Sequence, residues 1–186
     1  MLDCPPLLKS FYFPRLSLPD TDKKKALQIV EEFEDHCLPL MRKELKESYI
    51  HGDLNDQNLV VDHNGFVIGI IDFDDLVWSY AIVDLATAMM YVAVGLELAD
   101  ILDKLNLFYK SYCSIRQLTD IEKSLLYNLI LVRFVQSFSV SLYQIDNVDP
   151  QNEYLSTTHG PGKCVQCMNH LISIGKEEFM HKVFDL

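Results

Sequence analysis

The chain has 186 residues, of which 49% are hydrophobic and 23% are charged, and its net charge is −11. This length suits one domain, and this composition excludes a disordered or fibrous protein. With 27 acidic against 16 basic side chains, the surface would repel phosphate backbones, so we predict no nucleic-acid partner. An acidic surface of this kind tolerates or attracts a cationic small molecule.

The five cysteines favour a reduced compartment. Their number is odd, their spacing is irregular, and residues 1–6 lack the basic start and apolar run of a secretion signal. We therefore expect a cytoplasmic protein. Cys164 and Cys167 with His170 could form half of a zinc site, but no second pair follows at the spacing of a zinc finger. The alternative that we favour is one face of a helix.

Two apolar stretches, 81–98 and 124–143, have the length of membrane-spanning segments. The first contains Asp84, and the second contains Arg133 and Gln136 near its middle. An ionised group at the centre of a bilayer costs about 2.5–3.5 kcal/mol on insertion scales. We therefore predict two buried core helices and no membrane partner.

The chain is expected to begin with an irregular lead-in followed by a helix. Residues 1–20 are predicted to be extended because they contain four prolines, Pro5, Pro6, Pro14 and Pro19. The run Asp20-Thr21-Asp22 offers N-caps for a helix that continues to about residue 47. Pro39 is expected to kink or split that helix.

The centre of the chain predicts one β-hairpin. Short runs of strand-forming residues, 59–61 and 66–71, flank Asn64-Gly65, which is typical of a two-residue turn. With that turn the numbers of paired residues sum to 129, so Asn58 lies opposite Ile71. The later segments 81–94, 98–113, 119–145 and 163–184 are predicted helices. The fold class is therefore α+β and mostly helical.

The hairpin brings hard oxygen ligands together at its open end. Asn58 supplies an amide oxygen there, and Asp72 supplies a carboxylate one residue after the partner of Asn58. Both are ligands that Mg²⁺ prefers in proteins. Asp53 precedes Asn58 by five residues in the same loop. A base together with an Asn and an Asp on a metal ion is the minimal equipment for phosphoryl transfer.

Other kinds of site fit the sequence less well. A calcium loop beginning at Asp72 would need Gly at its sixth position and Glu at its twelfth, where the chain has Val77 and Val83. The segment 160–163 lacks the spacing and the Ser or Thr of an NTPase P-loop. A solvated loop remains the plain alternative for any single polar residue of this stretch.

At these residues the chain resembles the aminoglycoside phosphotransferase and choline kinase-like superfamily, whose members are relatives of protein kinases. The triplet His51-Gly52-Asp53 stands where protein kinases have His-Arg-Asp, and Ile71-Asp72 stands at the Asp-Phe-Gly motif. The resemblance covers about residues 44–178. It implies that Asp53 is the catalytic base and that Asn58 and Asp72 are Mg²⁺ ligands.

Finer motifs resemble a branch of this superfamily that acts on an amino acid. They are Asn55-Asp56 in place of His-Pro, Asp72-Phe73-x-Asp75, Met89-Met90-Tyr91, Arg133-Phe134-x-Gln136-Ser137 and Tyr154-Leu155. This resemblance implies transfer of the γ-phosphate of GTP to the hydroxyl of 5-hydroxylysine. The choice between GTP and ATP as donor stays open.

Further acidic and polar residues are expected to support this site. The resemblance implies that Asp84 braces the catalytic loop through backbone N–H groups, whereas a carboxylate favoured by the helix dipole is the alternative. His51 is expected to be a structural hydrogen-bonding residue. Asp74 and Asp75 could face the ammonium groups of the substrate, and a solvated loop is equally compatible with them.

The segment before His51 departs from the superfamily pattern. Kinases of this superfamily carry a β-rich N-terminal lobe with a loop over the phosphates and a Lys that pairs with them. We therefore expect 1–20 to be a lead-in and 21–186 to be a C-terminal catalytic lobe without its N-terminal lobe. Apolar surface left exposed on such a lobe favours self-association. The alternative to a kinase is a weak or inactive lobe that acts as a binding or interaction module.

Overall fold

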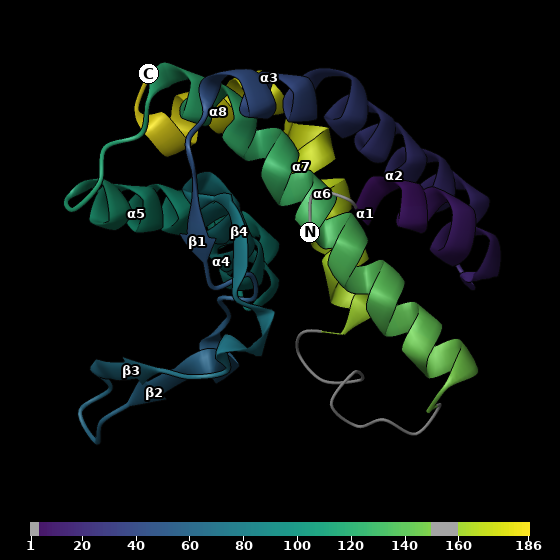
Figure 1. The fold of residues 1–186 in the computed structure, drawn as a ribbon, viewed down its shortest axis with the longest axis horizontal. Coiled ribbons are helices and arrows are strands. Elements are labelled where there is room, and N and C mark those ends of the chain that lie inside the picture. Colours follow the sequence, from purple (N-terminus) through teal and green to yellow (C-terminus); the bar gives the residue numbers. More distant parts are fainter. Residues whose placement is uncertain (1–3, 150–159) are drawn as a thin grey trace.

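The computed structural model describes residues 4–149 and 160–186 and is mostly helical (Figure 1). The motif Tyr154-Leu155 lies outside the described residues. The longest helix, α6 (Asp120–Asn147), packs against α2 (Asp20–Glu32), α4 (Ala81–Val94) and α7 (Pro161–Ile174). Their apolar faces belong to one hydrophobic core. Two small antiparallel sheets accompany the helices, so the predicted α+β, mostly helical class is confirmed.

The prediction of an extended lead-in is wrong for the described part of that segment. Short helical pieces follow one another there: α1 (Cys4–Leu7), η1 (Leu8–Tyr12) and η2 (Phe13–Arg15). Prolines are compatible with this because the first turn of a helix has no acceptor for their missing N–H groups. Leu8 is fully buried and Leu16 is 3% exposed, so the segment is anchored in the core.

The second helical segment contains the predicted break near Pro39. It consists of α2, the wide π-helical turn η3 (Phe33–Cys37) and α3 (Leu38–Glu44). Pro39 lies in the first turn of α3, and the wide turn precedes it directly. A proline cannot donate to the carbonyl four residues earlier, which accounts for the change of helical form. The helix ends before the predicted residue 47 because that residue begins a strand.

A second sheet was not predicted from the sequence. β1 (Glu47–Ile50) pairs antiparallel with β4 (Val77–Tyr80), whereas the predicted hairpin consists of β2 (Leu59–Val61) and β3 (Val67–Ile70). Of the four residues of β1, only Glu47 lies within the helix predicted from the sequence. Their strand conformation depends on pairing with residues about thirty positions later, which no local pattern reveals.

The hairpin has the predicted register at its open end and a different turn at its tip. Leu59 faces Ile70, but a bulge between Val60 and Val61 places Val61 opposite Val67. The turn spans 62–66, with Gly65 at a φ of 82°. The change of register caused by the longer turn is cancelled by the bulge, so the pairing at the open end is the predicted one. The Ile71 N–H therefore donates to the Asn58 carbonyl, as predicted, at 3.0 Å.

The remaining helices follow the predicted order. Helix α4 matches the predicted 81–94, and η6 (Leu98–Asp100) leads into α5 (Ile101–Cys113). Helix α6 begins after Thr119, whose side chain forms a capping box with Glu122. The predicted helix 163–184 is two helices, α7 and α8 (Lys176–Phe184), because Gly175 adopts a φ of 83° between them.

Helix α6 is long and apolar enough to cross a membrane by length and composition alone, with a mean hydropathy of 1.5 over its most apolar window. The fold buries 67% of that window, which is typical of the core helix of a globular protein. Helix α4 is also largely buried. The burial predicted for both apolar segments is therefore observed, and the absence of a membrane partner stays a prediction.

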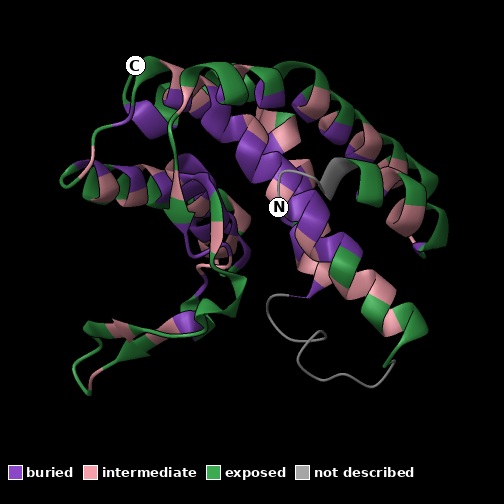
Figure 2. Ribbon diagram, in the orientation of Figure 1, coloured by how far each residue is buried: buried purple, intermediate pink, exposed green. Residues whose placement is uncertain are grey.

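The hairpin β2–β3 projects from the helical body and is exposed over most of its length (Figure 2). The segment after the hairpin, in which η5 (Phe73–Asp75) leads into β4, is exposed as well. The large apolar side chains involved are 38–69% exposed: Val60, Val61, Phe66, Val67, Ile68, Ile70, Ile71, Phe73, Leu76 and Trp78. Most sheets in globular domains pack at least one face against the core. This amount of exposed apolar surface is therefore unusual for an isolated domain.

Candidate active site

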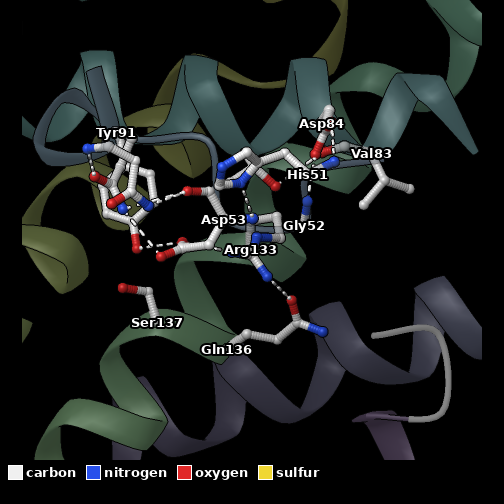
Figure 3. Close-up of polar contacts among 12 residues, drawn as sticks. His51, Gly52, Asp53, Val83, Asp84, Tyr91, Arg133, Gln136 and Ser137 are labelled. Carbon is white, nitrogen blue, oxygen red and sulfur yellow. Dashed lines mark hydrogen bonds and ion pairs between the residues drawn. The ribbon is translucent and has the colours of Figure 1, made fainter. Parts of the chain in front are cut away.

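The loop between β1 and β2 is fixed to helix α4 by one carboxylate. Asp84, in the first turn of α4, accepts the backbone N–H of His51 at 2.7 Å and the backbone N–H of Gly52 at 2.9 Å (Figure 3). This is the contact that the sequence led us to expect of Asp84. The two charge-assisted hydrogen bonds hold the backbone immediately before Asp53.

Removal of the Asp84 carboxylate should destabilise the fold. We expect Asp84→Ala to lower the free energy of unfolding by about 2–5 kcal/mol, since it leaves two N–H groups of buried residues without an acceptor. Urea unfolding followed by circular dichroism measures the change. Asp84→Asn, which keeps one acceptor oxygen, should lose less. An unchanged unfolding midpoint for Asp84→Ala would show that the loop is held by other contacts.

Gly52 is required by its backbone conformation and by its neighbour. Its φ is 87°, and a Cβ atom there would lie 2.6 Å from the carbonyl oxygen of Asp75. The loop before Asp53 and the end of η5 therefore approach each other as closely as a glycine permits.

We expect Gly52→Ala to lower the free energy of unfolding by at least about 1–2 kcal/mol, the cost of a left-handed non-glycine residue. Displacement of the Asp75 backbone adds to that cost. Thermal unfolding checks it, with Gly162→Ala as the matched control, because a Cβ at Gly162 meets no atom within 4 Å. Equal melting temperatures for the two variants would contradict the close approach at Gly52.

His51 links the loop between β1 and β2 to the hairpin, in agreement with the structural role predicted for it. Its Nε2–H donates to the Ile71 carbonyl at 2.9 Å, and its Nδ1 accepts a long hydrogen bond of 3.4 Å from the Asp53 N–H. This pattern assigns the proton to Nε2. The ring is 7% exposed and lies 5.1 Å from the ring of Phe73. The imidazole therefore joins the loop that carries Asp53 to the segment between β3 and Asp72.

Three side chains surround the carboxylate of Asp53 (Figure 3). Its Oδ2 accepts a hydrogen bond of 2.9 Å from the Asn55 amide, and its Oδ1 accepts one of 3.1 Å from the Tyr91 hydroxyl. The guanidinium of Arg133 lies 3.8 Å from Oδ1. The carboxyl side chain is still 31% exposed, so it is oriented from several sides and accessible to a ligand.

Asn58 is buried at the end of η4 (Asp56–Asn58), directly before β2. Its Nδ2 donates to the Asp53 carbonyl at 2.8 Å, and its backbone N–H donates to Oδ1 of Asn55 at 3.1 Å. Because the amide nitrogen is engaged, the amide oxygen is the atom that remains for a metal ion. The loop therefore fixes the orientation of the Asn58 side chain through its amide nitrogen.

Asp72 occupies a strained backbone position next to the partner of Asn58. Its φ of 63° and ψ of 61° are left-handed, and it is one of two such non-glycine residues in the described chain. Conformations of this kind gather at functional sites. No group of three His, Cys, Asp or Glu side chains in the described chain is arranged to hold a metal. A metal site here would consist of one carboxylate, one amide, water and phosphate oxygens, which suits Mg²⁺.

A cavity of about 610 Å³ lies beside Asp53. Asp74, Asp75 and Val77 line it on one side, and Arg133, Gln136 and other residues of α6 line it on the other. Asp74 and Asp75 are exposed, and the structure brings both to the cavity that contains the predicted base. The cavity therefore combines the carboxylate of Asp53 with two carboxylates from η5 and one guanidinium from α6.

Sequence reasoning did not assign site roles to Asn55, Tyr91 or Arg133. In the sequence, Asn55 is only a departure from His-Pro, and Tyr91 and Arg133 are only parts of longer motifs. The available signal was composition, because an Arg and a Gln within an apolar helix require buried polar partners. Arg133 lies far from Asp53 in the sequence, so the sequence does not show that Asp53 is its partner.

The alternative zinc site has no support from the described residues. Cys164 and Cys167 are buried on α7, and burial raises the pKa of Cys164 to about 11. The Cys167 thiol contacts the Ala93 carbonyl at 3.6 Å. A thiol kept protonated in an apolar core is a poor metal ligand. These residues pack the helix, which is the alternative favoured from the sequence.

Comparison with known proteins places this site in a family context. Residues 8–110, more than half of the chain, match the model of the phosphotransferase enzyme family. Hydroxylysine kinase of Danio rerio is 29% identical over 169 residues, and the match covers 89% of this chain and 46% of that protein. Hydroxylysine kinase of Xenopus laevis is 30% identical over 169 residues, covering 85% of this chain and 44% of that protein. The chain thus spans less than half the length of these curated relatives.

Proposed function

Because this chain belongs to the phosphotransferase enzyme family, we propose that it is a small-molecule kinase acting on the hydroxyl group of 5-hydroxy-L-lysine. The observation that carries the proposal is the braced loop, which holds Asp53 at a cavity while the hairpin pairs Asn58 with Ile71, the residue directly before Asp72. The names of the relatives support the choice of 5-hydroxylysine as acceptor.

The phosphate donor that we propose is GTP, with ATP as the alternative. Asn58 and Asp72 would hold Mg²⁺ through an amide and a carboxylate oxygen. When bound, the ion neutralises charge on the phosphate oxygens. The hard, neutral-plus-anionic pair fits this ion better than it fits zinc or copper.

Asp53 is the proposed catalytic base. The acceptor oxygen forms a bond to the γ-phosphorus, the bond between that phosphorus and the bridging β-phosphate oxygen breaks, and the nucleoside diphosphate leaves with the electron pair. The hydroxyl proton passes to the carboxylate of Asp53. Asn55 and Tyr91 hold that carboxylate by its two oxygens, so its free lone pairs are oriented before the acceptor binds.

Asp74 and Asp75 are proposed to contact the ammonium groups of the acceptor. Both carboxylates are exposed at the cavity that contains Asp53. Paired carboxylates favour a diamine, and the overall negative charge of the chain favours approach of a cationic molecule.

The proposed location is the cytoplasm. Cys37, Cys113, Cys164 and Cys167 are free thiols in the structure, and all four are buried. Free cysteines in this number are typical of proteins from reducing compartments, which supports the proposal.

The experiment that tests the function is a phosphate-transfer assay with radiolabelled GTP or ATP and 5-hydroxylysine. It is run on this chain and on a fusion that adds the part of the Danio rerio protein outside the match. We expect transfer by the fusion, and much weaker transfer by the chain alone because positioning of the triphosphate dominates this chemistry. Lysine, which lacks the hydroxyl, is the control acceptor. Transfer to neither acceptor by the fusion would overturn the proposed function.

A second candidate function, a lobe that binds another protein chain without turnover, is favoured by the apolar hairpin surface. Exposed apolar patches of this kind mark interaction surfaces. We expect the chain to self-associate in a concentration-dependent way, as measured by analytical ultracentrifugation. Ile68→Lys should reduce the association because Ile68 is 66% exposed on β3. Ile115→Lys, 93% exposed and distant from the hairpin in the sequence, is the control. A monomer at all concentrations would contradict this expectation.

A further inference from the structure

The cavity beside Asp53 carries opposite charges on its two walls. Asp74 and Asp75 belong to η5, whereas Arg133 belongs to α6. Arg133 is the one cationic residue among the described residues that line this cavity. A ligand that satisfies both walls therefore needs a positive group and a negative group at separate positions.

The guanidinium of Arg133 has more donors than the structure uses. Its Nη1 donates to the Gln136 amide oxygen at 2.9 Å, and its Nη2 forms a long ion pair of 3.8 Å with Asp53, which is beyond hydrogen-bonding distance and leaves the N–H donors of Nη2 without an acceptor there. Its Nε makes no hydrogen bond within the described residues. The side chain is only 12% exposed. A guanidinium carries five N–H donors, and a nearly buried one costs free energy unless an anion pairs with it.

We propose that Arg133, oriented by Gln136, binds the carboxylate of an amino-acid acceptor. This inference rests on the proposed function, in which the acceptor is 5-hydroxylysine. A carboxylate can accept two parallel hydrogen bonds from one guanidinium, a geometry that an amide or an ammonium group cannot supply. Arg133 would thereby select amino acids over amines that lack a carboxylate. Asp74 and Asp75 bind the ammonium groups of the acceptor.

The size of the acceptor agrees with the spacing of the site. In 5-hydroxylysine three carbons separate the carboxylate carbon from the carbon that bears the hydroxyl. With C–C bonds of about 1.5 Å, these two carbons lie roughly 4–5 Å apart in extended and bent forms. The Arg133 Nη2 and the Asp53 Oδ1 are 3.8 Å apart. One molecule can therefore present its hydroxyl to Asp53 and its carboxylate to Arg133.

The charges also agree with this acceptor. The lining contains the carboxylates of Asp53, Asp74 and Asp75 and the guanidinium of Arg133. A ligand with two ammonium groups and one carboxylate has the complementary excess of positive charge. A triphosphate has the opposite balance, so the three carboxylates disfavour it in this cavity.

The test compares binding of two probes, 5-hydroxylysine and its carboxamide, by isothermal titration calorimetry on the unsubstituted chain. The carboxamide retains the hydroxyl and both amines but lacks the anionic group. We expect it to bind about 10- to 100-fold more weakly, the range for hydrogen bonds to charged groups. This comparison needs no substitution, so it does not depend on the folding of a variant.

Variants then assign the discrimination to one side chain. Arg133→Gln should weaken binding of 5-hydroxylysine to the level of the carboxamide and leave carboxamide binding nearly unchanged. Arg133→Lys, which keeps the charge without the planar donors, should retain part of the preference. Lys123→Gln is the matched control, since it removes one positive charge from the same helix about 15 Å along the axis from Arg133 and outside the cavity lining.

The outcomes separate this inference from the proposed function. Equal affinity of the unsubstituted chain for both probes, or an equal loss for both in Arg133→Gln, would overturn the role of Arg133 while leaving the proposed acceptor in place. Weaker binding of GTP with Mg²⁺ by Arg133→Gln, with the preference for 5-hydroxylysine retained, would assign Arg133 to the donor phosphate and overturn the inference. Failure of 5-hydroxylysine to bind the unsubstituted chain would overturn the proposed acceptor, and this inference with it.

Discussion

Asp53→Asn should lower the turnover of the fusion with the remainder of the relative by about 10²–10⁴-fold, the usual contribution of a positioned proton acceptor. Asparagine has nearly the same shape and can still accept a hydrogen bond from Tyr91 or Asn55, so the loop should keep its structure. It cannot take the proton of the acceptor hydroxyl. Steady-state phosphate transfer to 5-hydroxylysine measures the loss.

Nucleotide binding should hardly change in Asp53→Asn, because this carboxylate contacts the acceptor and not the donor in the proposed reaction. Asp56→Asn is the matched control, since it makes the same chemical change at an exposed position of the same loop. Turnover of Asp53→Asn within a few-fold of the parent would remove Asp53 from its role as base. A large loss in Asp56→Asn would assign the effect to the loop instead.

Asp72→Ala should raise the Mg²⁺ concentration required for activity and lower turnover at saturating Mg²⁺ by about 10²-fold or more. The reason is that a metal ion supplies several kcal/mol of charge stabilisation to the transferring phosphate, and Asp72 is the charged ligand of the proposed pair. Asn58→Ala should have a smaller effect because an amide oxygen carries no formal charge. The Mg²⁺ dependence of the initial rate measures both.

A binding measurement gives an independent check on Asp72. Mn²⁺ replaces Mg²⁺ as a paramagnetic probe, and its binding to each variant is followed by electron paramagnetic resonance. Asp100→Ala, an exposed carboxylate on η6, controls for the loss of one negative charge. Unchanged metal dependence and unchanged Mn²⁺ affinity in both Asp72→Ala and Asn58→Ala would show that the hairpin does not hold the ion.

Local patterns in the sequence predicted most helices and the open end of the hairpin. Helix α4 has the predicted bounds, and Pro39 follows a change of helical form. Leu59 faces Ile70 as predicted, although the turn and the bulge differ from the expected geometry. These features depend on neighbours within a few residues, for which turn and helix propensities carry enough information.

Several elements could not be predicted because their partners are distant in the sequence. β1 is a strand because it pairs with β4, and the segment before Leu16 is helical because Leu8 finds a place in the core. Neither partner is visible in a local window. Propensity is a weak guide when long-range packing decides the conformation.

The sequence by itself determined which residue types stand at the candidate site. The triplet at Asp53, the amide at Asn58 and the carboxylate at Asp72 form a pattern, and the hairpin register already brought the last two together. The resemblance to the phosphotransferase superfamily also implied that Asp84 braces this loop. Each of these residues lies within about thirty positions of the others, so spacing carried the information.

Only the tertiary structure decided what surrounds the carboxylate of Asp53. Tyr91 reaches it from α4, and Arg133 approaches it from α6, eighty positions later in the chain. The packing of these two helices in one core creates that proximity. The hydrophobic pattern of each helix shows which face is buried, but it does not show which polar side chains of the two helices will meet. The second charged wall of the cavity is therefore a property of the packed helices.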